Sequence, residues 1–342
     1  MSLARNIRNT LAFAAIGDSM GAATETLTFD QIRDVFGGPL TELVAPPATA
    51  YATGNKPGEV TDDFSQIYYT CEEVIANDGV LTRDVAAKAL FRWKANPKYD
   101  RFLGPTTTAA LEMYKNGETE YKAPGNSLVV DYAAKATNGA AMKIATAGIL
   151  HPGDLEGATE AAITIASVTH DNDLALSGAI AVACATAESL SENATVESVL
   201  AAGYYGAVHG RAVAGARSRK VAGANVAARI ELAYQIASGP GTKEERLRKL
   251  GDVVGSGIHI SEAVASAFGC IMLNKDDVLQ AVIDAVNIGY DTDTVACITG
   301  SMVGGLARTE DSRVEGYVEI IEAASDINLL AMAEKLASYS QN

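Results

Sequence analysis

Residues 287–306, with the sequence NIGYDTDTVACITGSMVGGL, carry the pattern that decides the fold class. After Thr294 the apolar side chains recur at helical spacing, beginning with Val295 and Ile298, which predicts a largely buried helix. The residues from Asp291 to Thr294 then form the start of that helix. Two carboxylates and two hydroxyls therefore crowd one helix N-terminus.

This acidic helix start has two interpretations. In one, Thr292 or Asp293 caps the helix, and the acids favour the positive end of the helix dipole. In the other, the oxygens form half of a site for a hard cation, because Mg²⁺ and Ca²⁺ select carboxylate and hydroxyl oxygens. Caps are commoner than metal sites. The metal interpretation therefore needs further oxygen ligands from another part of the chain.

A second acidic helix start, Thr61-Asp62-Asp63, lies more than two hundred residues earlier. Residues 37–60 before it contain four prolines and four glycines, which predicts a loop, and helical apolar spacing begins at Phe64. Together the two starts would cluster four carboxylates, which do not all stay ionised in a core without cations. Two divalent ions would supply the four balancing positive charges.

The first helix is expected from about residue 4 to residue 25. Gly17 and Gly21 stand four residues apart and would let another helix approach closely. Asp18 and Glu25, seven apart, share a face of this helix. Either Asp18 caps a neighbouring helix end while Glu25 is solvated, or both acids belong to the site.

Two further polar stretches precede small-residue helices. Asn138-Gly139 predicts a tight turn, either an ordinary one with Lys143 as a surface charge or one whose backbone approaches a ligand. His170 stands beside a predicted helix cap at Asp173, where a structural histidine is commoner than a ligand. The helix that follows is expected from residue 174 to residue 187.

The composition predicts one all-α domain over residues 1–342. Ala, Leu and Glu are abundant, alternating β-branched runs are scarce, and no linker or internal repeat divides the chain. Residues 82–125 are read as two helices separated by Asn96-Pro97 and Gly104-Pro105. Trp93, the single tryptophan, is expected in the core or at a domain edge.

Charge and cysteine usage limit the possible partners and compartments. The net charge of −15 argues against nucleic acid or an anionic membrane as a partner. The four cysteines have no CxxC spacing and fit buried reduced thiols. No signal-peptide pattern begins the sequence, and the apolar run at residues 174–187 is too short to span a bilayer. The expected location is cytoplasmic.

These stretches occur together in a recognisable order, and the chain resembles the ADP-ribosylglycohydrolase family over most of its length. That family includes the dinitrogenase reductase-activating glycohydrolases and the J1 crystallins. The motifs that carry the resemblance are Gly17-Asp18-Ser19-Met20-Gly21 with Glu25, Pro57-Gly58-Glu59-Val60-Thr61-Asp62-Asp63, Asn138-Gly139-Ala140-Ala141-Met142-Lys143, Thr169-His170 and Asp291-Thr292-Asp293-Thr294.

The resemblance implies an orthogonal multi-helix bundle around a central cleft that holds two Mg²⁺ ions, with Mn²⁺ as a substitute. Glu25 and Asp63 would be the catalytic carboxylates, one of them assisting proton transfer. Asn138, Gly139 and His170 would line the ligand cleft. The metal ligands would be Thr61, Asp62, Asp63, Asp291, Asp293 and Thr294.

The implied chemistry is hydrolysis at the anomeric carbon of a ribosyl group, in a small molecule or an ADP-ribosylated protein. Three departures from the family concern the pocket: Phe64, Tyr290 where a second glycine is common, and residues 134–137. Tyr290 would bind substrate and could narrow the pocket toward a nucleoside-sized ligand. An N-ribohydrolase of a free metabolite and a non-catalytic crystallin-like protein therefore remain alternatives, and these motifs specify neither the aglycone nor the oligomeric state.

Overall fold

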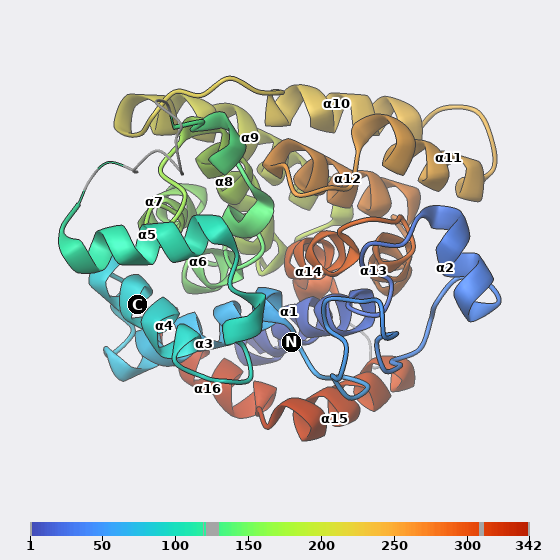
Figure 1. Ribbon diagram of the computed structural model, residues 1–342, viewed down its shortest axis with the longest axis horizontal. Helices are drawn as coiled ribbons and strands as arrows, with labels where there is room; N and C mark the ends of the chain where they lie inside the picture. The colour runs from blue at the N-terminus through green and yellow to red at the C-terminus, as the bar shows by residue number, and fades with distance from the viewer. Residues whose placement is uncertain (1, 119, 121–129, 308–310, 341–342) are drawn as a thin grey trace.

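The structure, a computed structural model, describes residues 2–118, 120, 130–307 and 311–340, and it is built from helices (Figure 1). Within these ranges there is no strand, and the extended pairing consists of two isolated bridges, Thr137 with His259 and Asn172 with Arg219. The predicted all-α class is confirmed. The α-helices are α1 (Leu3–Gly21), α2 (Phe29–Phe36), α3 (Asp62–Ala76), α4 (Arg83–Lys94), α5 (Pro105–Asn116), α6 (Ala145–Leu150), α7 (Leu155–Ala166), α8 (Asp173–Ser189), α9 (Val196–Arg217), α10 (Val226–Ala237), α11 (Lys243–Lys249), α12 (Ile260–Leu273), α13 (Val278–Val286), α14 (Thr292–Val303), α15 (Ser312–Ser325) and α16 (Leu329–Tyr339).

Several short helical turns join these helices. A single π-helical turn, Leu250–Val254, continues α11 toward α12. The 3₁₀ turns are Asp100–Phe102, Ala133–Lys135, Asn138–Ala140 and Gly304–Leu306.

Helices α1 and α14 pack side by side at the centre of the fold, as Figure 1 shows. All twelve residues of α14 are buried, which agrees with the predicted buried helix. The two helices run antiparallel, and glycines lie where their backbones meet. A Cβ atom on Gly21 of α1 would lie 2.5 Å from the Asp293 Cα, and one on Gly300 of α14 would collide with the Phe13 carbonyl group. The close approach predicted from Gly17 and Gly21 is therefore present, and its partner is the acidic helix α14.

The observed boundaries differ from the expected ones at a few places. Helix α1 ends at Gly21 rather than Glu25, because turns follow it and Thr26 has a left-handed φ of +68°. The two helices expected in residues 82–125 are α4 and α5, and α5 ends at Asn116 before the left-handed Gly117. Of that expected stretch, residues 119 and 121–125 lie outside the described residues. Helix α8 contains the expected segment 174–187.

The buried interior agrees with the remaining predictions. Trp93 is fully buried, and its Nε1 donates to the Ser65 hydroxyl at 2.8 Å. Residues 37–60 form no helix. All four cysteines are buried free thiols. Among the described residues, no helix has both the length and the apolar character that crossing a membrane requires.

The glycine contact between α1 and α14 gives a stability prediction. Gly300→Ala should lower the free energy of unfolding by about 1–3 kcal/mol, because the added methyl group overpacks against α1. Gly316→Ala on α15, where nothing lies within 4 Å of an added Cβ, should instead raise it by up to about 1 kcal/mol through helix propensity. Urea denaturation of both variants measures the difference. Equal effects would contradict the proposed packing constraint.

Candidate functional site

The first carboxylate of the site, Asp18 on α1, is fully buried and caps α3. Its Oδ2 accepts hydrogen bonds from the backbone N–H groups of Thr61 at 2.9 Å and Phe64 at 3.1 Å, and its Oδ1 accepts one from the Thr61 hydroxyl. Thr61, the N-cap residue, makes no side-chain capping bond of its own. The expectation that Asp18 bonds a neighbouring helix end is therefore confirmed.

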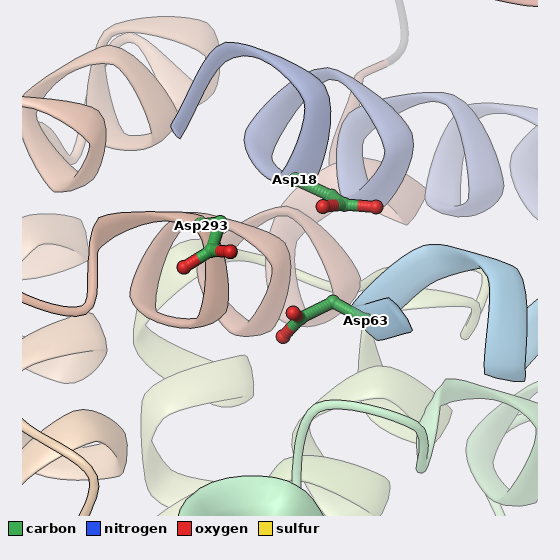
Figure 2. A group of neighbouring side chains, drawn as sticks. All are labelled: Asp18, Asp63 and Asp293. Carbon is green, nitrogen blue, oxygen red and sulfur yellow. The ribbon is translucent and has the colours of Figure 1, made fainter. Parts of the chain in front are cut away.

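Asp18 also belongs to a group of three buried aspartates, with Asp63 from α3 and Asp293 from α14 (Figure 2). One carboxylate oxygen from each lies within 4.8 Å of the others. Asp63 Oδ1 is buried without a hydrogen-bond partner among the described residues. A buried polar atom of this kind is costly unless a ligand satisfies it.

A second group of three shares Asp293 and adds Glu25 and Asp291, again with oxygens within 4.8 Å of one another. Both added residues are only partly buried, so this group lies closer to solvent than the first. The backbone holds them together: the Thr26 N–H donates to the Tyr290 carbonyl at 2.6 Å, and the Tyr290 N–H donates to the Leu27 carbonyl at 2.9 Å. These two backbone hydrogen bonds form a clamp that holds the segment after α1 against the segment before α14.

Burial raises the pKa of every carboxyl group in this cluster, and neighbouring carboxylates add to the rise for Glu25, Asp62, Asp63 and Asp293. Burial raises the pKa of Asp18 to about 6, although its hydrogen bonds act in the opposite direction. Burial and then neighbouring carboxylates raise the pKa of Asp62 to about 7 and that of Glu25 to about 8. The pKa values of Asp63 and Asp293 are raised well above the ordinary range for the same two reasons. The negative charges of these carboxylates are therefore not fully balanced by positively charged side chains.

The donor set fits hard divalent cations. It consists of oxygen atoms, it includes a buried oxygen without a partner, and its two groups of three share one aspartate. Magnesium, manganese and calcium prefer carboxylate oxygen, whereas zinc sites usually contain nitrogen or sulfur. Cations at this position would also balance the charge that raises the pKa values.

The residues predicted as metal ligands fall into three classes of position. Asp63, Asp291 and Asp293 belong to the two groups. The Thr294 side chain acts against the rise in the pKa values of Asp63 and Asp291, which places it beside both groups. Thr61 uses its hydroxyl to bond Asp18, and Asp62 belongs to neither group although its charge interacts with both.

Sequence reasoning did not assign Asp18 to the cation site. The available signal was its place between Gly17 and Gly21, because a carboxylate on a face that closely contacts another helix must be buried. The N-cap of α14 is Asp291, rather than Thr292 or Asp293, and it makes no side-chain capping bond. Simple capping therefore does not explain the acidic start of α14.

Asn138, Gly139 and His170 come together beside this cluster. Asn138 Nδ2 donates to Asp291 Oδ2 at 2.5 Å, which links the Asn-Gly turn to α14. Gly139 lies against the His170 ring, since an added Cβ would be 3.2 Å from its Cε1. The ring is buried, and its nitrogens bond the hydroxyls of Thr137 and Thr169, each at 2.7 Å. The hydrogen-bonded His170 ring thus packs against the Asn138–Gly139 turn and holds it in place.

Two expectations in this region were wrong. Lys143 is not a surface charge but is 1% exposed, because the segment that carries it packs between α3 and α14. The N-cap of α8 is Asn172 rather than Asp173, because the Asn172 side chain accepts the hydrogen bond from the Ala175 N–H. Asp173 instead pairs with Arg211 at 2.7 Å.

The raised carboxyl pKa values predict how stability depends on pH. A group whose pKa is raised in the folded state favours folding when protonated, so its contribution is lost as pH rises through the folded value. For Asp18, Asp62 and Glu25 these values are about 6, 7 and 8. The Tm of the protein in chelator should therefore fall, by roughly 5 °C or more between pH 5.5 and 8.5.

Thermal unfolding followed by circular dichroism measures this change. Asp293→Asn should reduce the slope, because it removes one of the repelling charges, whereas the exposed Asp252→Asn should leave it unchanged. A Tm in chelator that rises over this pH range would contradict the prediction.

The chain is similar in sequence and in fold to several known proteins. A protein called YegU from Escherichia coli (strain K12) is 26% identical over 337 residues, covering 96% of this chain and 95% of the relative. A protein from Archaeoglobus fulgidus is 28% identical over 302 residues, covering 87% and 86%. A solved structure of an ADP-ribosylglycohydrolase-related protein complex has the same fold, with a TM-score of 0.63, 22% identity and coverage of 98% and 99%.

The family model for ADP-ribosylglycohydrolase matches residues 1–338, nearly the whole chain. The match includes both acidic helix starts and every carboxylate of the two groups. The chain belongs to the ADP-ribosylglycohydrolase family.

Proposed function

We propose that the protein is a metal-dependent glycohydrolase that cleaves the bond between the anomeric carbon of a ribosyl group and its leaving group. Family membership supports glycohydrolase activity in general. The observation that carries the metal dependence is the pair of carboxylate groups that share Asp293, together with the unpartnered Asp63 Oδ1. This oxygen-rich cluster is better explained by divalent cations than by capping.

In this proposal, two Mg²⁺ or Mn²⁺ ions are held by the two groups, with Asp293 common to both. The ligands are drawn from the sequence-predicted set, Thr61, Asp62, Asp63, Asp291, Asp293 and Thr294, with the addition of Asp18 and Glu25. When bound, such ions act as Lewis acids and orient hydroxyl groups and water. Asp18 has the further task of fixing the start of α3, because its oxygens accept three hydrogen bonds from that segment.

Glu25 is the better candidate for proton transfer. Asp63 is 2% exposed, whereas Glu25 is only partly buried. A general base must reach the water whose proton it accepts. Glu25 would take a proton from the water that attacks the anomeric carbon, while Asp63, the other sequence-predicted candidate, stays with the cations.

The substrate we favour is an ADP-ribosyl-type molecule, either free or attached to a protein. Asn138 and Gly139 present a turn beside Asp291, and His170 fixes that turn through its hydrogen-bonded ring. Tyr290 is 52% exposed immediately before Asp291, where it would contact the part of the substrate beyond the ribose. A free nucleoside-like metabolite is the second candidate, since this ring would restrict a larger ligand.

A release assay tests the proposed function. The protein with Mg²⁺ should release free ADP-ribose or ribose from a panel of ADP-ribosyl proteins, ADP-ribosyl small molecules and nucleosides, and excess chelator should abolish release. Asp293→Asn should lose turnover by a factor of about 10³ or more, because the shared ligand is gone. Asp252→Asn, at an exposed position, is the matched control.

Each outcome separates the candidates. Release from nucleosides alone would replace the ADP-ribosyl substrate with a free metabolite. Full activity in chelator would refute the metal dependence. No release from any substrate, with Mg²⁺ bound in calorimetry, would favour a crystallin-like protein without turnover.

The side chain of Tyr290 gives a second prediction. Its backbone has a left-handed φ of +70°, where glycine is favoured, and its ring lies against Gly257. Tyr290→Gly should therefore relieve about 1 kcal/mol of backbone strain while it removes the exposed ring next to Asp291. The ratio of kcat/KM for an ADP-ribosyl protein to that for a nucleoside should rise at least fivefold, as steady-state kinetics would show.

Asp326→Gly is the matched control for strain. Asp326 also has a left-handed φ, +57°, but it ends α15 and is exposed. This variant should gain similar stability without a change in substrate preference. An unchanged preference in Tyr290→Gly would remove Tyr290 from the substrate site.

A further inference from the structure

Lys143 is the one lysine or arginine among the described residues that is buried, with 1% of its surface exposed. It lies in the turn between the Asn138–Ala140 segment and α6. The residues around it contact both acidic helices: the Met142 carbonyl accepts from the Cys297 thiol of α14 at 3.8 Å, and the Thr146 hydroxyl donates to the Ile67 carbonyl of α3 at 3.5 Å. The segment that carries the buried Lys143 therefore packs against both α3 and α14.

The ammonium group makes one hydrogen bond in the described structure, from Lys143 Nζ to the Thr169 hydroxyl at 2.9 Å. No described carboxylate forms an ion pair with it. Thr169 in turn bonds His170 Nδ1, whose ring is held from the other side by Thr137. The lysine side chain is therefore held by Thr169 and makes no direct hydrogen bond or ion pair with the described carboxylates.

An unpaired buried ammonium group is costly and needs compensation. Here the compensation is electrostatic attraction at a distance, because the negative charges of Asp62 and Asp63 favour its protonated form. The attraction is reciprocal, since Lys143 opposes the rise in the pKa of Asp62. Lys143 is thus a buried positive charge that partly balances the negative charge of Asp62 and Asp63.

We infer that Lys143 is a built-in counter-cation that sets how tightly the carboxylate cluster binds divalent ions. Its positive charge opposes the carboxylate charges when ions are absent, and it repels ions that enter. The hydrogen bond to Thr169 keeps the ammonium group outside the cluster, so that it weakens ion binding without occupying the site. This inference rests on the proposed function only in that the cluster takes divalent ions.

The test measures ion affinity and does not require turnover. Lys143→Met removes the charge at similar volume, and Lys143→Gln removes the charge but keeps a donor for Thr169. At pH 6.5, below the pKa of about 7 to which burial lowers the ammonium group, both variants should bind Mn²⁺ or Mg²⁺ roughly tenfold more tightly in calorimetry. A purely structural lysine predicts weaker or unchanged binding.

Thr169→Val is the matched control, because it removes the hydrogen bond and leaves the charge. It should bind ions no more tightly than the unaltered protein. If one lysine variant fails to fold, as judged by circular dichroism, the other carries the test.

Unchanged or weaker binding in a folded lysine variant would overturn the counter-cation role and leave the proposed hydrolase intact. Tighter binding without turnover on any substrate would support this role and refute the hydrolase. Absence of ion binding in every form would overturn both.

Discussion

The close antiparallel contact of α1 with α14 is the constraint on which the site depends. Glycines at the contact leave no side chain between the backbones, so the start of α14 lies directly against the end of α1. Hydrogen bonds then fix the register: the Thr292 hydroxyl donates to the Gly21 carbonyl at 3.0 Å, and the Thr24 hydroxyl donates to the Thr292 hydroxyl at 2.9 Å. Asp18 and Asp293 face the same space because of this contact (Figure 2).

The same contact creates an electrostatic problem that hydrogen bonds solve only in part. Asp18 accepts hydrogen bonds from the first turn of α3, which supports its negative charge in the interior. Asp63 has one oxygen with no partner, and the pKa values of Asp63 and Asp293 are raised well above the ordinary range. The burial of Asp18 is thus explained largely by its hydrogen bonds to α3, whereas the described residues leave one oxygen of Asp63 without a partner and the pKa values of Asp63 and Asp293 raised.

Much of this arrangement could be predicted from the sequence, because its parts lie at helix starts. Apolar periodicity after Thr294 and Phe64 located two buried helices, and the acids before each one had to be explained together. The glycine spacing of α1 indicated a close helix contact but not which helix makes it. That Asp18 joins Asp63 and Asp293 depends on the positions of three helices, which no local pattern encodes.

The burial of Lys143 could not be read from the sequence for a different reason. Its neighbours Ala140 and Ala141 are small, and small residues are equally suited to an exposed turn and to tight packing. A lysine in such a segment is ordinarily a surface charge, because burying an ammonium group is costly. Only the placement of this turn between two acidic helices reverses that expectation, since nearby negative charge offsets part of the cost.

The buried and the solvent-exposed parts of the carboxylate cluster are held in place by different kinds of contact. The buried part consists of Asp18, Asp63 and Asp293, which are fixed by helix contacts, so a change there would disturb both packing and charge. The exposed part lies next to Thr26 and Tyr290, two residues with left-handed φ that are joined by a backbone hydrogen bond, and the Tyr290 side chain is exposed there. Because the clamp uses only backbone groups, it holds Glu25 near Asp291 whatever side chain stands at position 290. The resident tyrosine can therefore change the exposed space next to Asp291 without moving the neighbouring carboxylates.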